Sequence, residues 1–167
     1  FLYVHKDSQA RGWQPLSGWH GHAAPFDFEG DYAPAPGILR FRTGTHSALA
    51  YAPLEASLRL WREVDMTALR AKSLALGELF QDCLTDLFES KGIEDITPPV
   101  AERGSQVALI HREHGYAIVQ ALIARGVIGD YRAPGLMRFG FTPLYLSYED
   151  VWQAARHFRE VVETREY

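Results

Sequence analysis

The period of the hydrophobic positions changes along the chain. Residues 1–4 read FLYV, an apolar, aromatic and partly β-branched run that predicts a buried strand. Residues 9–46 have no period because glycine and proline interrupt them repeatedly, yet they carry aromatic residues such as Trp13 and Trp19. A stretch this long without regular elements is unusual in a compact domain and tends to be functional. We therefore expect it to pack against other parts of the protein and to help shape a site.

From residue 47 to about residue 91 the pattern becomes helical. A first helix is predicted over residues 49–61, where leucines and a tryptophan recur. Asp65 is placed to cap the N-terminus of a second helix. The apolar positions of that helix recur at intervals of three and four as far as Phe88, and Gly92 is placed just past its end. The sequence thus predicts one long amphipathic helix that packs against another layer.

The remainder of the chain alternates between the two periods. The predicted elements are, in order, a strand over 106–111, a helix over 115–125, strands over 127–131 and 136–141 around a turn at 133–135, and a final helix after Ser147, which with Asp150 resembles a capping box. The order β-α-β-β-α predicts a small α+β domain with helices on one face of a sheet. We divide the chain into residues 1–64, the end of one domain with a connecting helix, and residues 65–167, a complete small domain.

Composition excludes several classes of protein. The 167 residues are 47% hydrophobic and 23% charged, which is typical of a globular protein and not of a disordered one. Seventeen basic against twenty-one acidic residues give a net charge of −4, which argues against a nucleic-acid-binding domain. No apolar run is long enough to span a membrane. The single cysteine, Cys83, is interpreted as an inert core residue and fits a reducing compartment, so we expect a cytoplasmic protein.

Familiar catalytic signals are absent from the sequence. His20 with His22, and His111 with His114, could bind a metal, but zinc needs three or four convergent ligands, and we interpret these residues as turn and core histidines. The chain has no GxSxG elbow, GxGxxG motif or P-loop. Hydrolase-type serine chemistry and the common modes of nucleotide binding are therefore not supported.

Arg138 is the strongest candidate for a functional residue. It lies within LMRFG, a predicted strand that is otherwise apolar, so its guanidinium needs an anionic partner. The planar fork suits a carboxylate, which leaves two readings open: a carboxylate ligand, or an internal salt bridge at an outward-facing position. Trp19 and Thr45 offer an indole N–H and a hydroxyl that can donate to phosphate.

Several strings in order resemble the kynureninase family of bacteria. They are QPLSGWHGH at 14–22, PGI at 36–38, GT at 44–45, DM at 65–66, RGSQV at 103–107, ARGVIGD at 124–130 and RFGFTPLY at 138–145. The resemblance extends from residue 1 to about residue 155. It implies the C-terminal part of an α/β, aspartate-aminotransferase-like fold with a small α+β domain, in which residues 1–64 are the trailing edge of the large cofactor-binding domain.

The resemblance also implies an activity. The family hydrolyses L-kynurenine to anthranilate and L-alanine in tryptophan catabolism and NAD biosynthesis, uses pyridoxal 5′-phosphate, and forms a homodimer with the active site at the subunit interface. In the family a lysine holds the cofactor as a Schiff base, in a motif that would precede residue 1. We therefore expect a C-terminal part without a catalytic residue of its own and inactive alone.

Residue by residue, the resemblance assigns three roles. Trp19 matches the tryptophan that helps to hold the cofactor phosphate, and Thr45 matches a residue of the phosphate-side loop. Arg138 matches the arginine that grips the substrate α-carboxylate. Gly44 and Thr45 resemble the bacterial pair, which favours kynurenine over its 3-hydroxy form, whereas His20 departs from the aromatic residue often found there. Two other readings stay open: a related pyridoxal-phosphate lyase or aminotransferase, and a small domain without catalysis.

Overall fold

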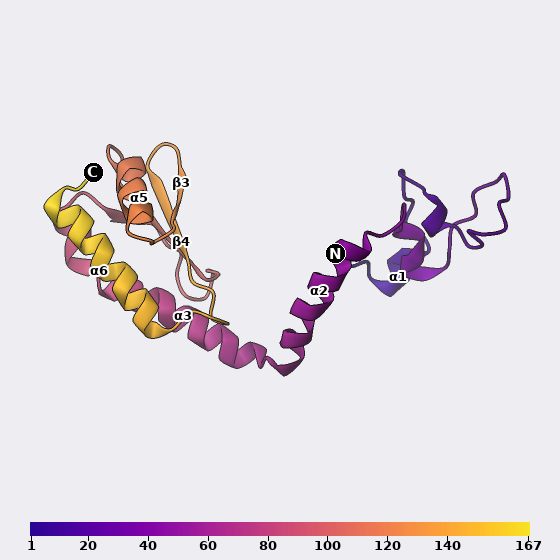
Figure 1. Cartoon of the computed structure of the whole chain (residues 1–167), viewed down its shortest axis with the longest axis horizontal. Helices are drawn as coiled ribbons and strands as arrows, with labels where there is room; N and C mark the ends of the chain where they lie inside the picture. The colour runs from indigo at the N-terminus through magenta and orange to yellow at the C-terminus, as the bar shows by residue number, and fades with distance from the viewer. The chain divides into compact units, whose positions relative to one another are not determined.

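The protein is described by a computed structural model that covers all 167 residues and divides into two compact units (Figure 1). The first unit is Phe1–Glu63 and the second is Val64–Tyr167. We predicted a boundary between residues 64 and 65 from the change of pattern. The assignment of the first segment to the edge of a larger domain stays a prediction.

The first unit consists of short helical turns joined by extended loops, followed by one longer helix. Its elements are α1 (Lys6–Gln9), η1 (Trp19–Gly21), η2 (Gly37–Phe41), α2 (Ala48–Leu60) and η3 (Trp61–Glu63). Helix α2 confirms the first predicted helix, and the Ser47 side chain caps it by accepting from the Ala50 amide. The predicted strand at residues 1–4 is wrong, because these residues form no strand and Phe1, Leu2 and Tyr3 are exposed. A strand needs a neighbouring ladder for its amides, and this unit offers residues 1–4 none.

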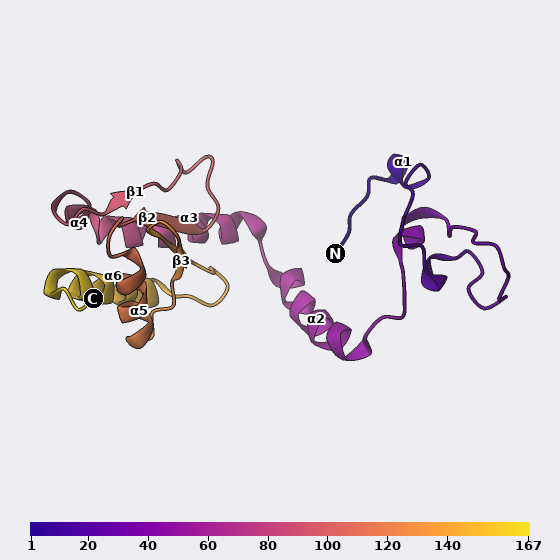
Figure 2. The ribbon, with the colours of Figure 1, turned by 90° about the horizontal axis from the view of Figure 1, so that it is seen from above.

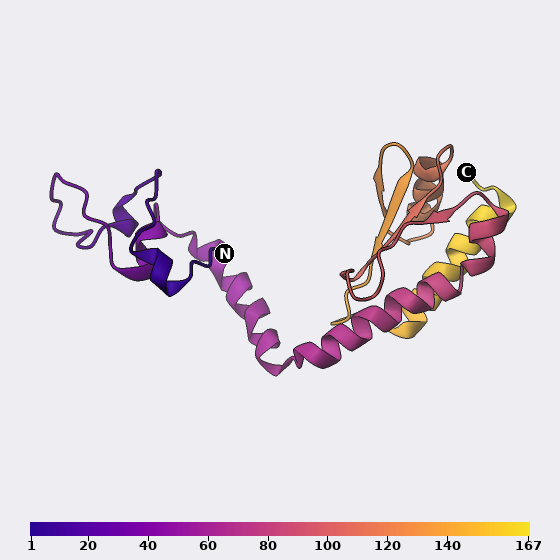
Figure 3. The ribbon, with the colours of Figure 1, turned by 180° about the vertical axis from the view of Figure 1, so that it is seen from behind.

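The second unit is a small α+β fold with an antiparallel sheet. Its elements are α3 (Met66–Asp82), α4 (Thr85–Ser90), β1 (Glu94–Asp95), β2 (Gln106–Ile110), α5 (Gly115–Ala124), β3 (Asp130–Arg132), β4 (Leu136–Gly140) and α6 (Tyr148–Thr164). The four strands pair in the order β1-β2-β4-β3. Helices α3 and α6 run alongside each other in Figures 1 and 3, and Figure 2 shows the same pair from above. The predicted α+β architecture is confirmed.

The core of the second unit lies between the sheet and its helices. Alternate residues of β2 and β4, such as Leu109 and Met137, are fully buried there, as expected for strands with one covered face. Phe80 of α3 and Phe158 of α6 pack against them. The intervening residues of the same strands are partly buried, as Arg138 is, or exposed. They share the sheet face opposite the core, which we call the open face.

Local capping signals in the sequence are confirmed. The Asp65 side chain accepts from the Thr67 amide at 2.8 Å and begins α3. Ser147 and Asp150 form the predicted capping box at the start of α6. Gly92 and Gly126, expected after helix ends, both have positive φ, a conformation that glycine adopts without steric cost.

Two predicted elements need correction. The long helix that was expected to reach Phe88 is broken at Leu84 into α3 and α4. The Arg159 guanidinium donates to the Cys83 carbonyl at 2.7 Å and so satisfies an acceptor that the break frees. The predicted strand over 127–131 is β3, which begins only at Asp130, and the short strand β1 was not predicted. None of the helices has the length and apolar composition that crossing a membrane requires.

Candidate functional site

Arg138 lies on the open face near the middle of the sheet. Strand β4 pairs with β2 on one side and with β3 on the other, so Arg138 has Ala108 and Asp130 as its two cross-strand partners. Cross-strand partners point to the same face and have their Cβ atoms about 5 Å apart. The side chain of Ala108 has no polar atom, so Asp130 is the cross-strand partner that can bind the guanidinium. The Arg138 side chain is 30% exposed.

The guanidinium of Arg138 binds Asp130 through one of its edges. Its Nε donates to Asp130 Oδ2 at 2.8 Å, and its Nη2 donates to the same oxygen. Chiefly because of this hydrogen bonding, the pKa of the Asp130 carboxyl lies below its usual range. The second reading given above, an internal salt bridge, is therefore part of the picture. The salt bridge does not use all donors of the guanidinium, because Nη1 makes no hydrogen bond within the chain.

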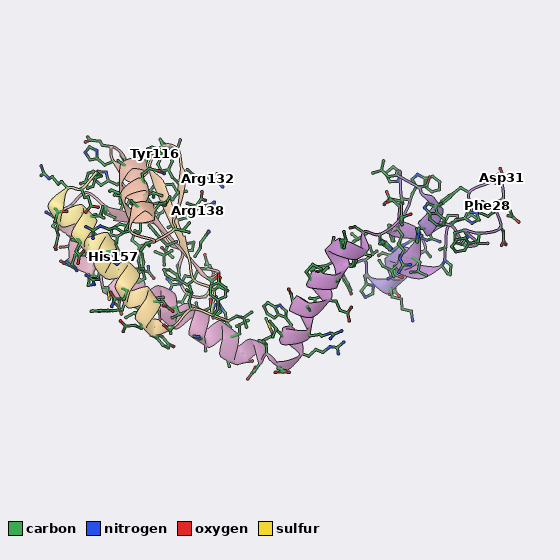
Figure 4. The ribbon with its side chains drawn as sticks, viewed as in Figure 1. Phe28, Asp31, Tyr116, Arg132, Arg138 and His157 are labelled. Carbon is green, nitrogen blue, oxygen red and sulfur yellow. The ribbon has the colours of Figure 1, made fainter.

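Arg132 completes a small charged cluster on the open face. Its Nε lies 3.4 Å from the same Asp130 oxygen, while its side chain remains mostly exposed. Figure 4 labels Arg132 and Arg138 on the strands of the second unit and His157 on α6. We call Asp130, Arg132 and Arg138 the Arg–Asp–Arg cluster. Two guanidinium groups against one carboxylate give it a net positive charge, which suits a singly charged anion.

The segments that carry Trp19 and Thr45 meet within the first unit. The His20 amide donates to the Thr43 carbonyl at 3.1 Å. A Cβ added at Gly18 would lie 2.3 Å from the same carbonyl oxygen, so only glycine allows this approach. The rings of His20 and His46 are 5.2 Å apart, one residue beyond Trp19 and Thr45 respectively.

The polar groups of Trp19 and Thr45 are available to a ligand. Trp19 is 44% exposed and Thr45 is exposed, and no hydrogen bond within the chain uses the indole N–H or the threonine hydroxyl. Each side chain therefore keeps a free donor of a kind that can bind a phosphate oxygen. Their role in cofactor binding remains a prediction, as does that of Arg138, which belongs to the other unit.

An aromatic cavity that the sequence analysis did not identify lies beside Trp19. It has a volume of about 680 Å³ and is lined by Phe26, Phe28 and Tyr32 among others. Phe28 has a φ of +53°, an uncommon conformation for a bulky residue. Figure 4 shows Phe28 and Asp31 on the outer loop of the first unit. The cluster of aromatic residues in a glycine-rich loop was the available signal for this cavity.

The remaining histidine candidates serve local structure. His22 Nδ1 accepts from the Ala24 amide at 2.9 Å. His111 is buried, its Nδ1 accepts from the His114 amide at 3.1 Å, and burial lowers its pKa. No group of three or more His, Cys, Asp or Glu side chains converges as metal ligands would. These contacts agree with turn and core roles.

Comparison with known proteins gives a consistent result. The kynureninase C-terminal domain family matches residues 69–158. Kynureninase of Burkholderia pseudomallei (strain K96243) is 44% identical over 165 residues, which cover 98% of this chain and 39% of that protein. Kynureninase of Pseudomonas fluorescens is 45% identical over 153 residues, 91% of this chain and 36% of that protein. The chain thus spans about two fifths of the length of the curated relatives that it matches.

The fold is also found in solved structures. A cysteine desulfurase from Thermococcus onnurineus NA1 superposes with a TM-score of 0.80 over 97% of this chain and 42% of its own, at 17% identity. At this identity the likeness concerns the fold alone. It confirms the predicted fold class: this chain has the fold of about two fifths of the chain of a cysteine desulfurase and of the cystine C-S lyase C-DES.

Proposed function

The chain belongs to the kynureninase family by its C-terminal domain, and from this premise we propose that it forms part of a pyridoxal-phosphate-dependent hydrolase that converts L-kynurenine and water to anthranilate and L-alanine. The observation that carries the proposal beyond family membership is Arg138, an arginine on an inner strand with a terminal nitrogen that makes no hydrogen bond in the chain. Such a group is suited to an α-carboxylate.

Arg138 fixes the orientation of the substrate. A guanidinium binds a carboxylate through two parallel hydrogen bonds, which restrict rotation as well as position. Holding the α-carboxylate determines which way the remaining bonds of the α-carbon point. Orientation of this kind lowers the barrier because less motional freedom is lost when the reaction occurs.

Trp19 and Thr45 would contact the phosphate of the cofactor through the indole N–H and the hydroxyl. Pyridoxal phosphate supplies the chemistry by accepting the electrons released when bonds to the substrate α-carbon break. The lysines of this sequence are Lys6, Lys72 and Lys91, and Lys72 donates to the Pro143 carbonyl. None matches the family's cofactor lysine, so in our proposal polypeptide outside residues 1–167 supplies it and the isolated chain is inactive. We also infer a homodimer, as the family resemblance implies.

The proposal is tested in a chimeric enzyme. The segment of Pseudomonas fluorescens kynureninase that matches this chain is replaced by this chain, and anthranilate formation from L-kynurenine is followed by fluorescence. We expect a cofactor-dependent hydrolase. Release of sulfide from cysteine, without anthranilate, would instead assign the chain to a lyase.

The role of Arg138 is tested in the same chimera. Arg138→Lys keeps the charge but removes the fork, and we expect the barrier to rise by about 2 kcal/mol, a loss of roughly 30-fold in kcat/KM. Arg156→Lys is the matched control, since Arg156 pairs with Glu160 on the surface of α6. Equal activity of the two variants would contradict the proposed role.

A further inference from the structure

The guanidinium of Arg138 has two edges, and the hydrogen bonds within the chain use only one of them. An arginine carries five N–H donors in a rigid plane. Nε and Nη2 together form the side edge, and both donate to Asp130 Oδ2. Nη1 and the second N–H of Nη2 form the end edge, whose two donors lie parallel. No hydrogen bond within the chain uses Nη1.

We propose that Asp130 is a positioning residue that holds the side edge of Arg138, so that the end edge is presented to the carboxylate of the substrate. The inference rests on the proposed function and adds a residue to the same site. Asp130 does not touch the substrate in this arrangement. It acts by restricting the rotation of a long side chain that would otherwise have many orientations.

The sheet fixes this contact. Asp130 and Arg138 are cross-strand partners in the pairing of β3 with β4, so backbone hydrogen bonds determine their separation. On the other side of Arg138 the cross-strand partner is Ala108, which offers the guanidinium no acceptor from its side chain. Asp130 is therefore the side chain that sets the orientation of the guanidinium.

Arg132 compensates for the negative charge that Asp130 brings to the site. An isolated Asp130–Arg138 pair has no net charge and would attract a carboxylate weakly. Arg132 lies 3.4 Å from the same oxygen and restores one positive charge to the cluster. It also favours the ionised form of Asp130, in agreement with the lowered pKa of that carboxyl.

Two effects of removing Asp130 have opposite signs, which makes the inference testable. If Asp130 positions Arg138, its loss frees the guanidinium and weakens substrate binding. If Asp130 only competes with the substrate for Arg138, its loss adds net positive charge and strengthens binding. In the chimera, we expect Asp130→Ala to raise KM for L-kynurenine about 10-fold, the cost of ordering one long side chain, with kcat changed less than threefold.

A ligand without the carboxylate separates positioning from general damage. Kynuramine is kynurenine without its α-carboxylate, and its inhibition constant should be unchanged by Asp130→Ala. Asp130→Asn keeps the size of the side chain and one acceptor oxygen, so we expect a smaller rise in KM, and this variant serves if the alanine variant does not fold. Glu94→Ala is the matched control, because Glu94 is an exposed acid on β1 of the same sheet.

A second measurement requires no activity. In the 167-residue chain, the side-chain Nε–H signal of Arg138 should be protected from exchange with water, and Asp130→Ala should abolish the protection. The Nε–H of Arg132, which is mostly exposed, is the internal reference. Equal exchange of Arg138 in both proteins would overturn the inference.

The outcomes distinguish this inference from the proposed function. If Arg138→Lys has no effect, both fail. If Arg138→Lys lowers kcat/KM but Asp130→Ala leaves KM unchanged or lowers it, the positioning role alone is overturned. If Asp130→Ala weakens kynurenine and kynuramine equally, the residue has a general structural role and the inference is likewise overturned.

Discussion

Phe80 joins three elements of the second unit, and its removal should weaken that unit strongly. The side chain is fully buried on α3. Its ring centroid lies 5.2 Å from those of Phe139 on β4 and of Phe141 just beyond it, and 6.1 Å from that of Phe158 on α6. These are favourable separations for aromatic pairs. Phe80 thus couples α3 to the strand that carries the candidate arginine.

The expected magnitude follows from burial and from the cavity. Transfer of a phenylalanine side chain out of water is worth about 1.5–3 kcal/mol. A cavity among aromatic rings adds to this loss, so Phe80→Ala should cost about 3–5 kcal/mol. Domains of this size are typically stable by about 5–15 kcal/mol in total. The variant therefore loses a large fraction of the stability of the second unit.

Hydrogen exchange of the β2 and β4 amides measures this loss, because central strands exchange mainly through global unfolding. Urea unfolding followed by circular dichroism gives a second value. Tyr145→Ala is the control within the same unit, since Tyr145 is 75% exposed and should change stability by less than about 0.5 kcal/mol. A loss below about 1 kcal/mol for Phe80→Ala, with an unchanged denaturant slope, would refute this account of the core.

Two further predictions concern the first unit and the acid stability of the second. In the chimera, Trp19→Phe removes the indole N–H, and the dissociation constant of pyridoxal phosphate should rise about 10-fold, as expected for the loss of a hydrogen bond to a charged group. Equilibrium dialysis measures this constant, and Trp13→Phe is the control. Equal affinities of the two variants for pyridoxal phosphate would exclude the contact. In the isolated chain, hydrogen bonding from Arg159 lowers the pKa of the Asp86 carboxyl. The pair therefore stabilises the fold at a pH above about 4, the ordinary pKa of an aspartate in the unfolded chain. This stabilisation is lost as the pH falls through the lowered pKa of the folded state. Arg159→Met should therefore make urea stability less dependent on pH in the acid range, and identical pH profiles would contradict the pairing.

The sequence predicted those elements whose signals are local. Asp65 and Ser147 mark helix starts because a side-chain oxygen satisfies a nearby amide, and both caps are present. The break at Leu84 was missed because the apolar period continues through it, since Leu84 and Leu87 both face the same core. The acceptor that this break frees is satisfied by Arg159, 76 residues later, which no local pattern reveals.

The candidate site was predicted in part. Arg138 was identified because a guanidinium in an apolar strand needs a partner, but the partner itself was not. It could have been found: the predicted turn is centred on Pro134, and residues equally distant from it pair across the hairpin. Asp130 is four residues before and Arg138 four after. The meeting of the segments that carry Trp19 and Thr45 depends on the close approach of Gly18 to Thr43, a tertiary contact that pattern alone does not specify.

The strand order of the second unit has a consequence for how such a site can change. The arginine belongs to an interior strand, hydrogen-bonded along both sides, whereas its acidic partner belongs to a three-residue strand at the rim. Substitutions at a rim disturb few backbone bonds. Natural variation or protein engineering can therefore replace the acidic partner at the rim, while the arginine stays on a strand that is held by backbone hydrogen bonds on both sides.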